Sequence, residues 1–123
     1  MNDGLKQKLL DYGVDLQGAL HRFLGMEDMY ESFLQRYLED NSIHDIEMAM
    51  STDEYETVFK VSHALKGLAS NLGIEPIAKP SSELTELCRG KTKDEIDVTK
   101  ARAYADELRV ADAKLRELIE DRG

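Results

Sequence analysis

Hydrophobic residues recur every three to four positions along nearly the whole chain, and this spacing predicts helices. Gly13, Gly25, Gly73 and the turn at residues 40–42 interrupt the pattern. The alternation of apolar and polar residues that is typical of strands does not occur. The pattern therefore predicts an all-α fold with helices over residues 3–11, 15–24, 27–39, 42–50, 53–72, 76–88 and 98–120.

The short connections between these helices favour antiparallel neighbours. We expect an up-and-down four-helix bundle with additional short N-terminal helices, in a single domain of residues 1–123. Residues 1–25 would form an N-terminal helical extension and residues 26–121 the bundle.

The helix ends can also be predicted from the sequence. Ser42 is expected to cap the fourth helix, and Thr52 or Asp53 the fifth. Pro80 is expected to kink or delay the first turn of the helix that begins near Pro76, because it lacks a backbone donor.

The helix over residues 53–72 carries an unusual surface. Its apolar face is defined by Val58, Val61, Leu65, Leu68 and Leu72. At about 100° per residue, His63 falls almost opposite that face and should point into water. Lys66 and Gly67, three and four residues later, lie beside His63 on the same surface.

Three features distinguish this surface from an ordinary solvated one. Gly67 inside a helix costs about 0.5–1 kcal/mol relative to alanine, so close approach of another molecule is its expected use. Phe59 offers apolar contact area that folding does not require. Lys60 and Lys66 lie in a run from residue 59 to 71 without a carboxylate, which suits a phosphoryl group or an acidic partner pocket.

The run from His63 to Gly73, HALKGLASNLG, resembles the H-x-L-K-G…G signature of histidine-containing phosphotransfer (HPt) domains. The resemblance implies that His63 is phosphorylated, that Lys66 supports the phosphoryl oxygens and that Gly67 leaves room for the partner. It also suggests Ser70 as a phosphoryl contact. Thr85 appears at the position where some members place a glutamine that bonds to the imidazole. Phe59 and Lys60 complete the expected partner-binding surface.

The resemblance further implies a phosphorelay intermediate. It would accept a phosphoryl group from the phosphoaspartate of a response-regulator receiver domain and pass it to another receiver aspartate, in a pathway with a sensor histidine kinase. No cofactor is expected on this chain, because the Mg²⁺ ion should belong to the receiver. We expect a phosphocarrier without kinase or ATPase activity of its own.

The composition of the chain limits the classes of partner that it can bind. The chain has 25 acidic and 16 basic residues among 123, and its net charge of −9 argues against nucleic acid and anionic lipid as partners. One cysteine, Cys88, excludes an internal disulfide and suits a reducing compartment. The sequence shows no signal peptide and no apolar stretch of about 20 residues. We therefore expect a cytoplasmic protein, and a monomer, since one bundle can use every apolar stripe.

A different class of function stays open. The chain could be a helical docking module that scaffolds or inhibits a kinase or response regulator without carrying phosphate. The His63, Lys66 and Gly67 set argues against it, because docking alone does not require these residues. His21 and His44 are interpreted as surface or cap residues, and neither has the spacing of a zinc site.

Overall fold

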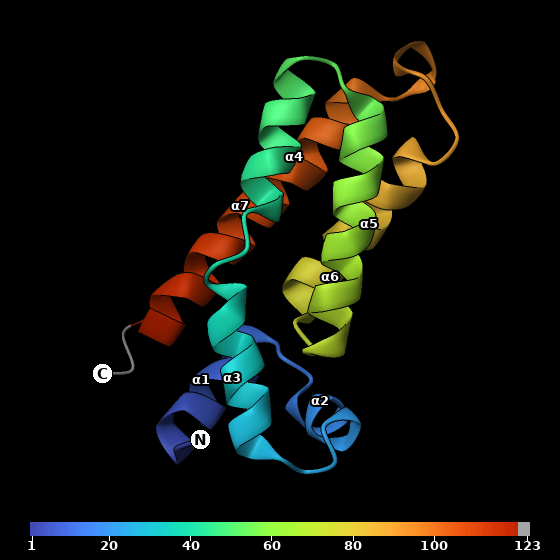
Figure 1. Cartoon of the computed structure of the whole chain (residues 1–123). Helices are drawn as coiled ribbons and strands as arrows, with labels where there is room; N and C mark the ends of the chain where they lie inside the picture. Colours follow the sequence, from blue (N-terminus) through green and yellow to red (C-terminus); the bar gives the residue numbers. More distant parts are fainter. Residues whose placement is uncertain (121–123) are drawn as a thin grey trace.

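The computed structural model describes residues 1–120 and confirms the all-α prediction (Figure 1). Within these residues the backbone forms helices joined by short connections, and the only strand-like feature is an isolated bridge between Val14 and Ile74. The helices are α1 (Asp3–Tyr12), α2 (Leu16–Arg22), α3 (Glu27–Tyr37), α4 (Ser42–Ser51), α5 (Tyr55–Asn71), α6 (Glu75–Cys88), the short 3₁₀ helix η1 (Lys93–Glu95) and α7 (Val98–Glu120).

Helices α4 to α7 form an antiparallel up-and-down bundle. In Figure 1, α4 runs up, α5 down, α6 up and α7 down, and α3 continues the line of α4 below it. Helices α1 and α2 lie at the lower end of the bundle. Side chains from all four bundle helices are fully buried in one core, among them Ile46, Leu65, Leu84 and Leu108. Burial of each such side chain contributes about 1.5–3 kcal/mol.

The apolar face of α5 differs slightly from the predicted one. Val61 and Leu68 are only half-buried, whereas Ser62 and Ala69 are fully buried. The face that packs against α6 is thus rotated toward small residues, which allow the two helix backbones to approach each other. On α7, Val98 is 41% exposed because it is the first residue of the helix.

The predicted helix caps are wrong at α4 and α5. Ser42 is the first residue of α4, and its N–H donates to the carboxylate of Asp40 at 2.8 Å. The hydroxyl of Thr52 contacts the Ala49 carbonyl of α4 at 3.3 Å instead of capping α5. Asp53 adopts a left-handed conformation with φ +59° in the turn before Tyr55. Local backbone geometry therefore overrides the capping preference of these side chains.

Helix α6 passes through Pro80 without a break. Pro76 lies in its first turn, where the missing N–H has no partner in any case. Pro80 lies one turn later and is buried, so it packs into the core while one backbone hydrogen bond of α6 is lost.

The N-terminal residues are joined to the end of α5. The N–H of Asp15 donates to the Gly73 carbonyl at 2.8 Å, beside the Val14–Ile74 bridge. Arg22 donates from Nη2 to the Ser70 carbonyl at 2.8 Å and from Nε to the Asn71 carbonyl at 3.1 Å. A cation at these C-terminal carbonyls also complements the helix dipole. Helix α2 therefore fixes the C-terminal end of the helix that carries His63.

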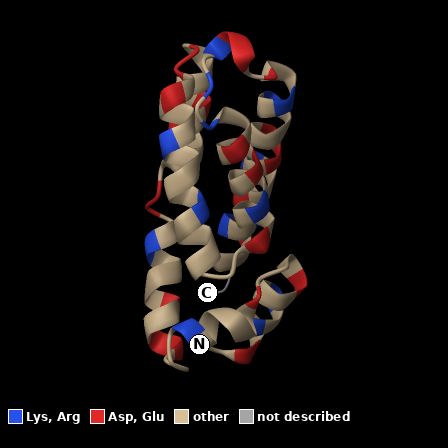
Figure 2. Ribbon diagram, turned by 90° about the vertical axis from the view of Figure 1, so that its right-hand side faces the viewer, with Lys and Arg blue, Asp and Glu red and all other residues tan. Residues whose placement is uncertain are grey.

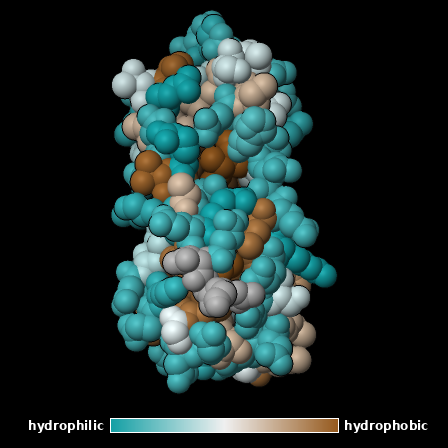
Figure 3. Space-filling view, turned by 90° about the vertical axis from the view of Figure 1, so that its left-hand side faces the viewer, coloured by the Kyte–Doolittle hydropathy of each residue, from teal (hydrophilic) through white to brown (hydrophobic). Residues whose placement is uncertain are grey.

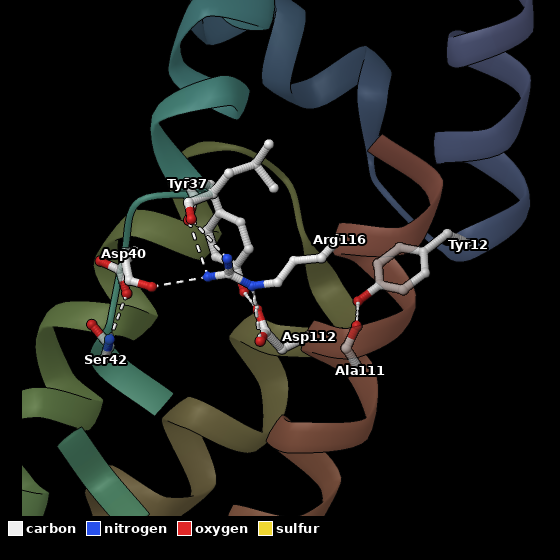
Figure 4. Close-up of polar contacts among 8 residues, drawn as sticks. Tyr12, Tyr37, Asp40, Ser42, Ala111, Asp112 and Arg116 are labelled. Carbon is white, nitrogen blue, oxygen red and sulfur yellow. Dashed lines mark hydrogen bonds and ion pairs between the residues drawn. The ribbon is translucent and has the colours of Figure 1, made fainter. Parts of the chain in front are cut away.

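Arg116 of α7 fastens the end of α3 to the bundle (Figure 4). It donates to the carbonyls of Leu38 and Asp40 at 2.7 and 2.9 Å and to the carboxylate of Asp112 at 3.0 Å. The hydroxyl of Tyr37 donates to the same carboxylate at 2.6 Å. These bonds use the donors of Arg116 within the fold, so this polar cluster has a structural role.

The face formed by the left-hand side of Figure 1 is mostly hydrophilic, with scattered apolar side chains (Figure 3). Among residues 1–120, no helix has the length and apolar character that crossing a membrane requires.

Candidate functional site

His63 projects from the middle of α5 into solvent, as the periodicity predicted. The ring of Phe59, one turn earlier, stacks on the imidazole with centroids 6.0 Å apart and ring planes at 16°. Within residues 1–120, neither ring nitrogen of His63 has a hydrogen-bond partner. The imidazole is thus held by a stacking contact on one side, while its nitrogens stay accessible to another molecule.

Gly67 leaves open space beside this imidazole. A Cβ built at this position has no atom within 4 Å apart from its own helix neighbourhood, so internal packing does not require glycine here. Lys66 is half-buried and forms no ion pair in the described part of the chain. Its ammonium group is therefore available to an anion at the surface of α5.

Lys60 and Ser70 lie on the exposed side of α5 one turn before and two turns after His63. The ammonium group of Lys60 pairs with the carboxylate of Glu56 at 3.4 Å, so its charge is partly balanced. The backbone carbonyl of Ser70 accepts a hydrogen bond from Arg22, and Ser70 remains exposed. Both predicted residues are accessible to a partner.

Thr85 does not occupy the predicted position. It is fully buried between α5 and α6, and its hydroxyl lies 2.9 Å from the Ser62 hydroxyl and 2.7 Å from the Ser81 carbonyl. It can bond neither to the imidazole nor to a partner, so its assignment as a partner-binding residue is wrong.

Two charged residues that were not predicted as site residues lie at the C-terminal end of α6, Glu86 in its last turn and Arg89 just after it. Arg89 holds its guanidinium 5.1 Å from the centre of the Phe59 ring. Its Nε and Nη2 donate to both carboxylate oxygens of Glu86 at 3.0–3.2 Å. The hydrogen bond from Arg89 lowers the pKa of the Glu86 carboxyl, with smaller electrostatic contributions from Lys66 and His63.

The surroundings of His63 are therefore of mixed charge. The run from residue 59 to 71 has no carboxylate of its own, but Arg89, which lies over the Phe59 ring, holds the Glu86 carboxylate close to it. Basic and acidic residues are also interspersed along the helices on the side of the molecule shown in Figure 2. A stretch of sequence within one helix does not show which residues of another helix lie beside it. Glu86 and Arg89 could therefore be found only from the packing of α6 against α5.

The other histidines, His21 on α2 and His44 on α4, are exposed and lie on different elements from His63. The described residues contain no group of three or more His, Cys, Asp or Glu side chains that could hold a metal ion. The site thus offers one accessible nucleophilic nitrogen group, one free ammonium and space above a glycine.

A family comparison agrees with this arrangement. The sequence model of the Hpt domain matches residues 28–121, which is most of the chain. The chain belongs to the Hpt domain family. Its members are phosphocarrier modules that work with receiver domains and kinases in two-component phosphorelays, so membership supports a phosphotransfer role for this chain.

Two curated relatives also match this Hpt protein. They are the sensory/regulatory protein RpfC from two strains of Xanthomonas campestris pv. campestris, each 36% identical over 67 residues. The match covers 52% of this chain but only 9% of the relatives, so the chain is similar to a small part of those proteins. No solved structure gave a significant match.

Proposed function

We propose that His63 is the phosphoacceptor of a phosphorelay, loaded from a receiver-domain phosphoaspartate and unloaded onto the aspartate of another receiver. The observation that carries this proposal is the accessible imidazole with open space over Gly67. A neutral imidazole is a nucleophile near pH 7, and its partner needs room to bring a phosphorus atom within bonding distance.

The chemical step is a displacement at phosphorus. A lone pair on one imidazole nitrogen forms the N–P bond, and the bond from phosphorus to the aspartyl oxygen breaks, so the carboxylate leaves with the electron pair. The second step reverses this exchange on the carboxylate of the next receiver. Transfer of this kind depends on positioning and on stabilisation of the phosphoryl charge.

Lys66 supplies part of that stabilisation. Its ammonium group is one turn from His63 and unpaired among the described residues, so it can bind a phosphoryl oxygen without first breaking an internal ion pair. The partner receiver would supply the Mg²⁺ ion and the acidic pocket. Phe59, Lys60 and Ser70 would contact the partner around the transferred group.

The test is phosphoryl transfer from a receiver domain that carries a labelled phosphoaspartate. Wild-type protein should take up label that is lost in acid and retained in base, as expected for phosphohistidine. His63→Gln should take up none while its helix content stays unchanged. His44→Gln is the matched control, because it removes another exposed histidine, and it should be labelled like wild type.

Other outcomes would reject the proposal. Equal labelling of His63→Gln and wild type would show that another residue is the acceptor. Binding to receivers without labelling of either protein would favour the docking module, whose residues contact a partner but carry no phosphate.

A further inference from the structure

Glu86 is an acidic residue close to the surface on which the proposed reaction would place a phosphoryl group. The carboxylate projects from the last turn of α6 and is joined to the surface of α5 through Arg89, whose guanidinium lies 5.1 Å from the centre of the Phe59 ring. A phosphoryl group on His63 carries a charge of about −1.5 to −2 near pH 7. A carboxylate at this position therefore opposes the charge that phosphorylation adds, while Lys66 favours it.

Glu86 also holds a second cation, Arg89, at this surface. Arg89 is bound to Glu86 through both Nε and Nη2, at 3.0–3.2 Å. The same guanidinium lies over the Phe59 ring, and Phe59 stacks on His63. One aromatic ring thus connects Arg89 to the imidazole, and the ion pair with Glu86 keeps the guanidinium there.

This ion pair is easily exchanged. The side chains of Arg89 and Glu86 are 49% and 57% exposed, and exposed ion pairs are weak. A phosphoryl group offers arginine a more highly charged partner in the same forked geometry. Because breaking the existing ion pair costs little free energy, Arg89 can exchange Glu86 for an arriving phosphoryl group.

We propose that Glu86 is an electrostatic competitor of the phosphoryl group on His63: it occupies Arg89 and repels the phosphate, and so keeps the phosphohistidine readily transferable. The inference rests on the proposed function of His63. The charge of Glu86 changes the equilibrium between phosphorylated and unphosphorylated carrier. Glu86 is therefore a positioning residue, and it takes no part in the making or breaking of bonds. A relay intermediate benefits, since a carrier that bound phosphate too strongly would retain it.

The test measures the equilibrium constant for phosphoryl exchange between the carrier and a receiver domain. Glu86→Gln keeps the size of the side chain and removes its charge, and it should shift the equilibrium toward phosphorylated carrier by about two- to fivefold. Glu117→Gln makes the same change at an exposed position on α7 and should leave the equilibrium constant unchanged. Circular dichroism checks that both variants remain folded.

A double-variant cycle isolates the part played by Arg89. If Glu86 acts partly by holding Arg89, Glu86→Gln should have a smaller effect in an Arg89→Gln background than in wild type. Equal effects in both backgrounds would overturn this part of the proposal. An unchanged or lowered equilibrium constant in the single Glu86→Gln variant would overturn the whole.

The two proposals fail in different ways. If His63 is not the phosphoacceptor, His63→Gln is labelled or wild type is not. If only the inference about Glu86 is wrong, wild type is labelled on His63 and Glu86→Gln matches Glu117→Gln.

Discussion

Gly67 is exposed inside a helix, where glycine is an unfavourable choice. Elsewhere in the molecule, Gly73 has a local structural reason, because its backbone is left-handed and closely surrounded. Gly67 has neither constraint, since α5 is regular around it and the space over it is empty. Contacts among the described residues therefore do not explain the glycine at this position. The proposed explanation is that a receiver domain approaches here and needs the space.

Gly67→Ala should have opposite effects on the stability of the protein and on the rate of phosphoryl transfer. Alanine should raise the free energy of unfolding by about 0.5–1 kcal/mol, because it removes the conformational entropy cost of glycine in a helix. The same methyl group should slow phosphoryl transfer, and Gly67→Gln should slow it further. Urea unfolding and rapid-mixing transfer kinetics give the two quantities, and transfer at the wild-type rate in both variants would contradict the clearance argument.

At the scale of single residues, the periodicity of α5 was enough to predict that His63 is exposed and that Lys66, Gly67 and Phe59 surround it. A regular helix fixes the relative directions of its own side chains. The prediction for Thr85 failed because it depended on the rotation of α6 about its axis, which is set by packing. Glu86 and Arg89 were missed for the same reason.

At the scale of elements, the junction between α5 and α6 depends on Gly73. This residue has φ +72°, and a Cβ there would lie 2.5 Å from the Asp15 carbonyl oxygen. The N–H of Asp15 donates to the carbonyl of Gly73, so the α1–α2 loop rests directly on this turn. Gly73 is therefore one of the contacts that couple the end of the histidine-bearing helix to the N-terminal residues, beside the bonds from Arg22.

Gly73→Ala should destabilise the protein more than Gly90→Ala. Both glycines are left-handed, so both substitutions carry backbone strain of about 1–2 kcal/mol. Gly90 has no atom within 4 Å of an added Cβ, whereas alanine at Gly73 must also displace a backbone carbonyl, for a total of about 3 kcal/mol. Thermal unfolding of the two variants measures the difference, and equal losses would show that the contact with Asp15 is dispensable.

The helices themselves were predictable because apolar spacing and breaker residues coincide at Gly13, Gly25 and Gly73. The caps of α4 and α5 were not predictable, because several polar residues stand near the start of each helix. Which of them caps the helix depends on the conformation of the preceding turn. A helix through Pro80 was predicted, but the expected delay of its first turn does not occur, because α6 already begins at Glu75 and the buried proline packs into the core.

At the scale of the whole molecule, buried tyrosines join α3 to the bundle. Tyr30 is fully buried and donates to the Leu72 carbonyl at 2.7 Å, and Tyr37 donates to Asp112 on α7. Burial raises the pKa of both phenols well above the ordinary value of 10.0, and for Tyr37 the bond to Asp112 adds to the effect. The folded state therefore holds these protons more tightly than the unfolded chain does.

Stability should consequently fall at alkaline pH. Because the folded pKa values are raised, their contribution is fully present below pH 10 and is lost as the pH rises above it. Each of the two phenols reduces the free energy of unfolding by up to about 1.4 kcal/mol per pH unit. Parallel pH titrations of tyrosinate absorbance and helix content should show both phenols ionising with unfolding; ionisation of all tyrosines in a fully helical protein would contradict this account.

The central claim is that His63 alone among the three histidines carries the phosphoryl group. Long-range ¹H–¹⁵N spectra resolve the ring nitrogens of each histidine, and they can be recorded before and after loading from a phosphorylated receiver. The account predicts a large shift and a coupling to phosphorus at one ring nitrogen of His63, with the rings of His21 and His44 unchanged. A phosphorus coupling at His21 or His44, or a loaded protein with no coupled ring nitrogen, would contradict it.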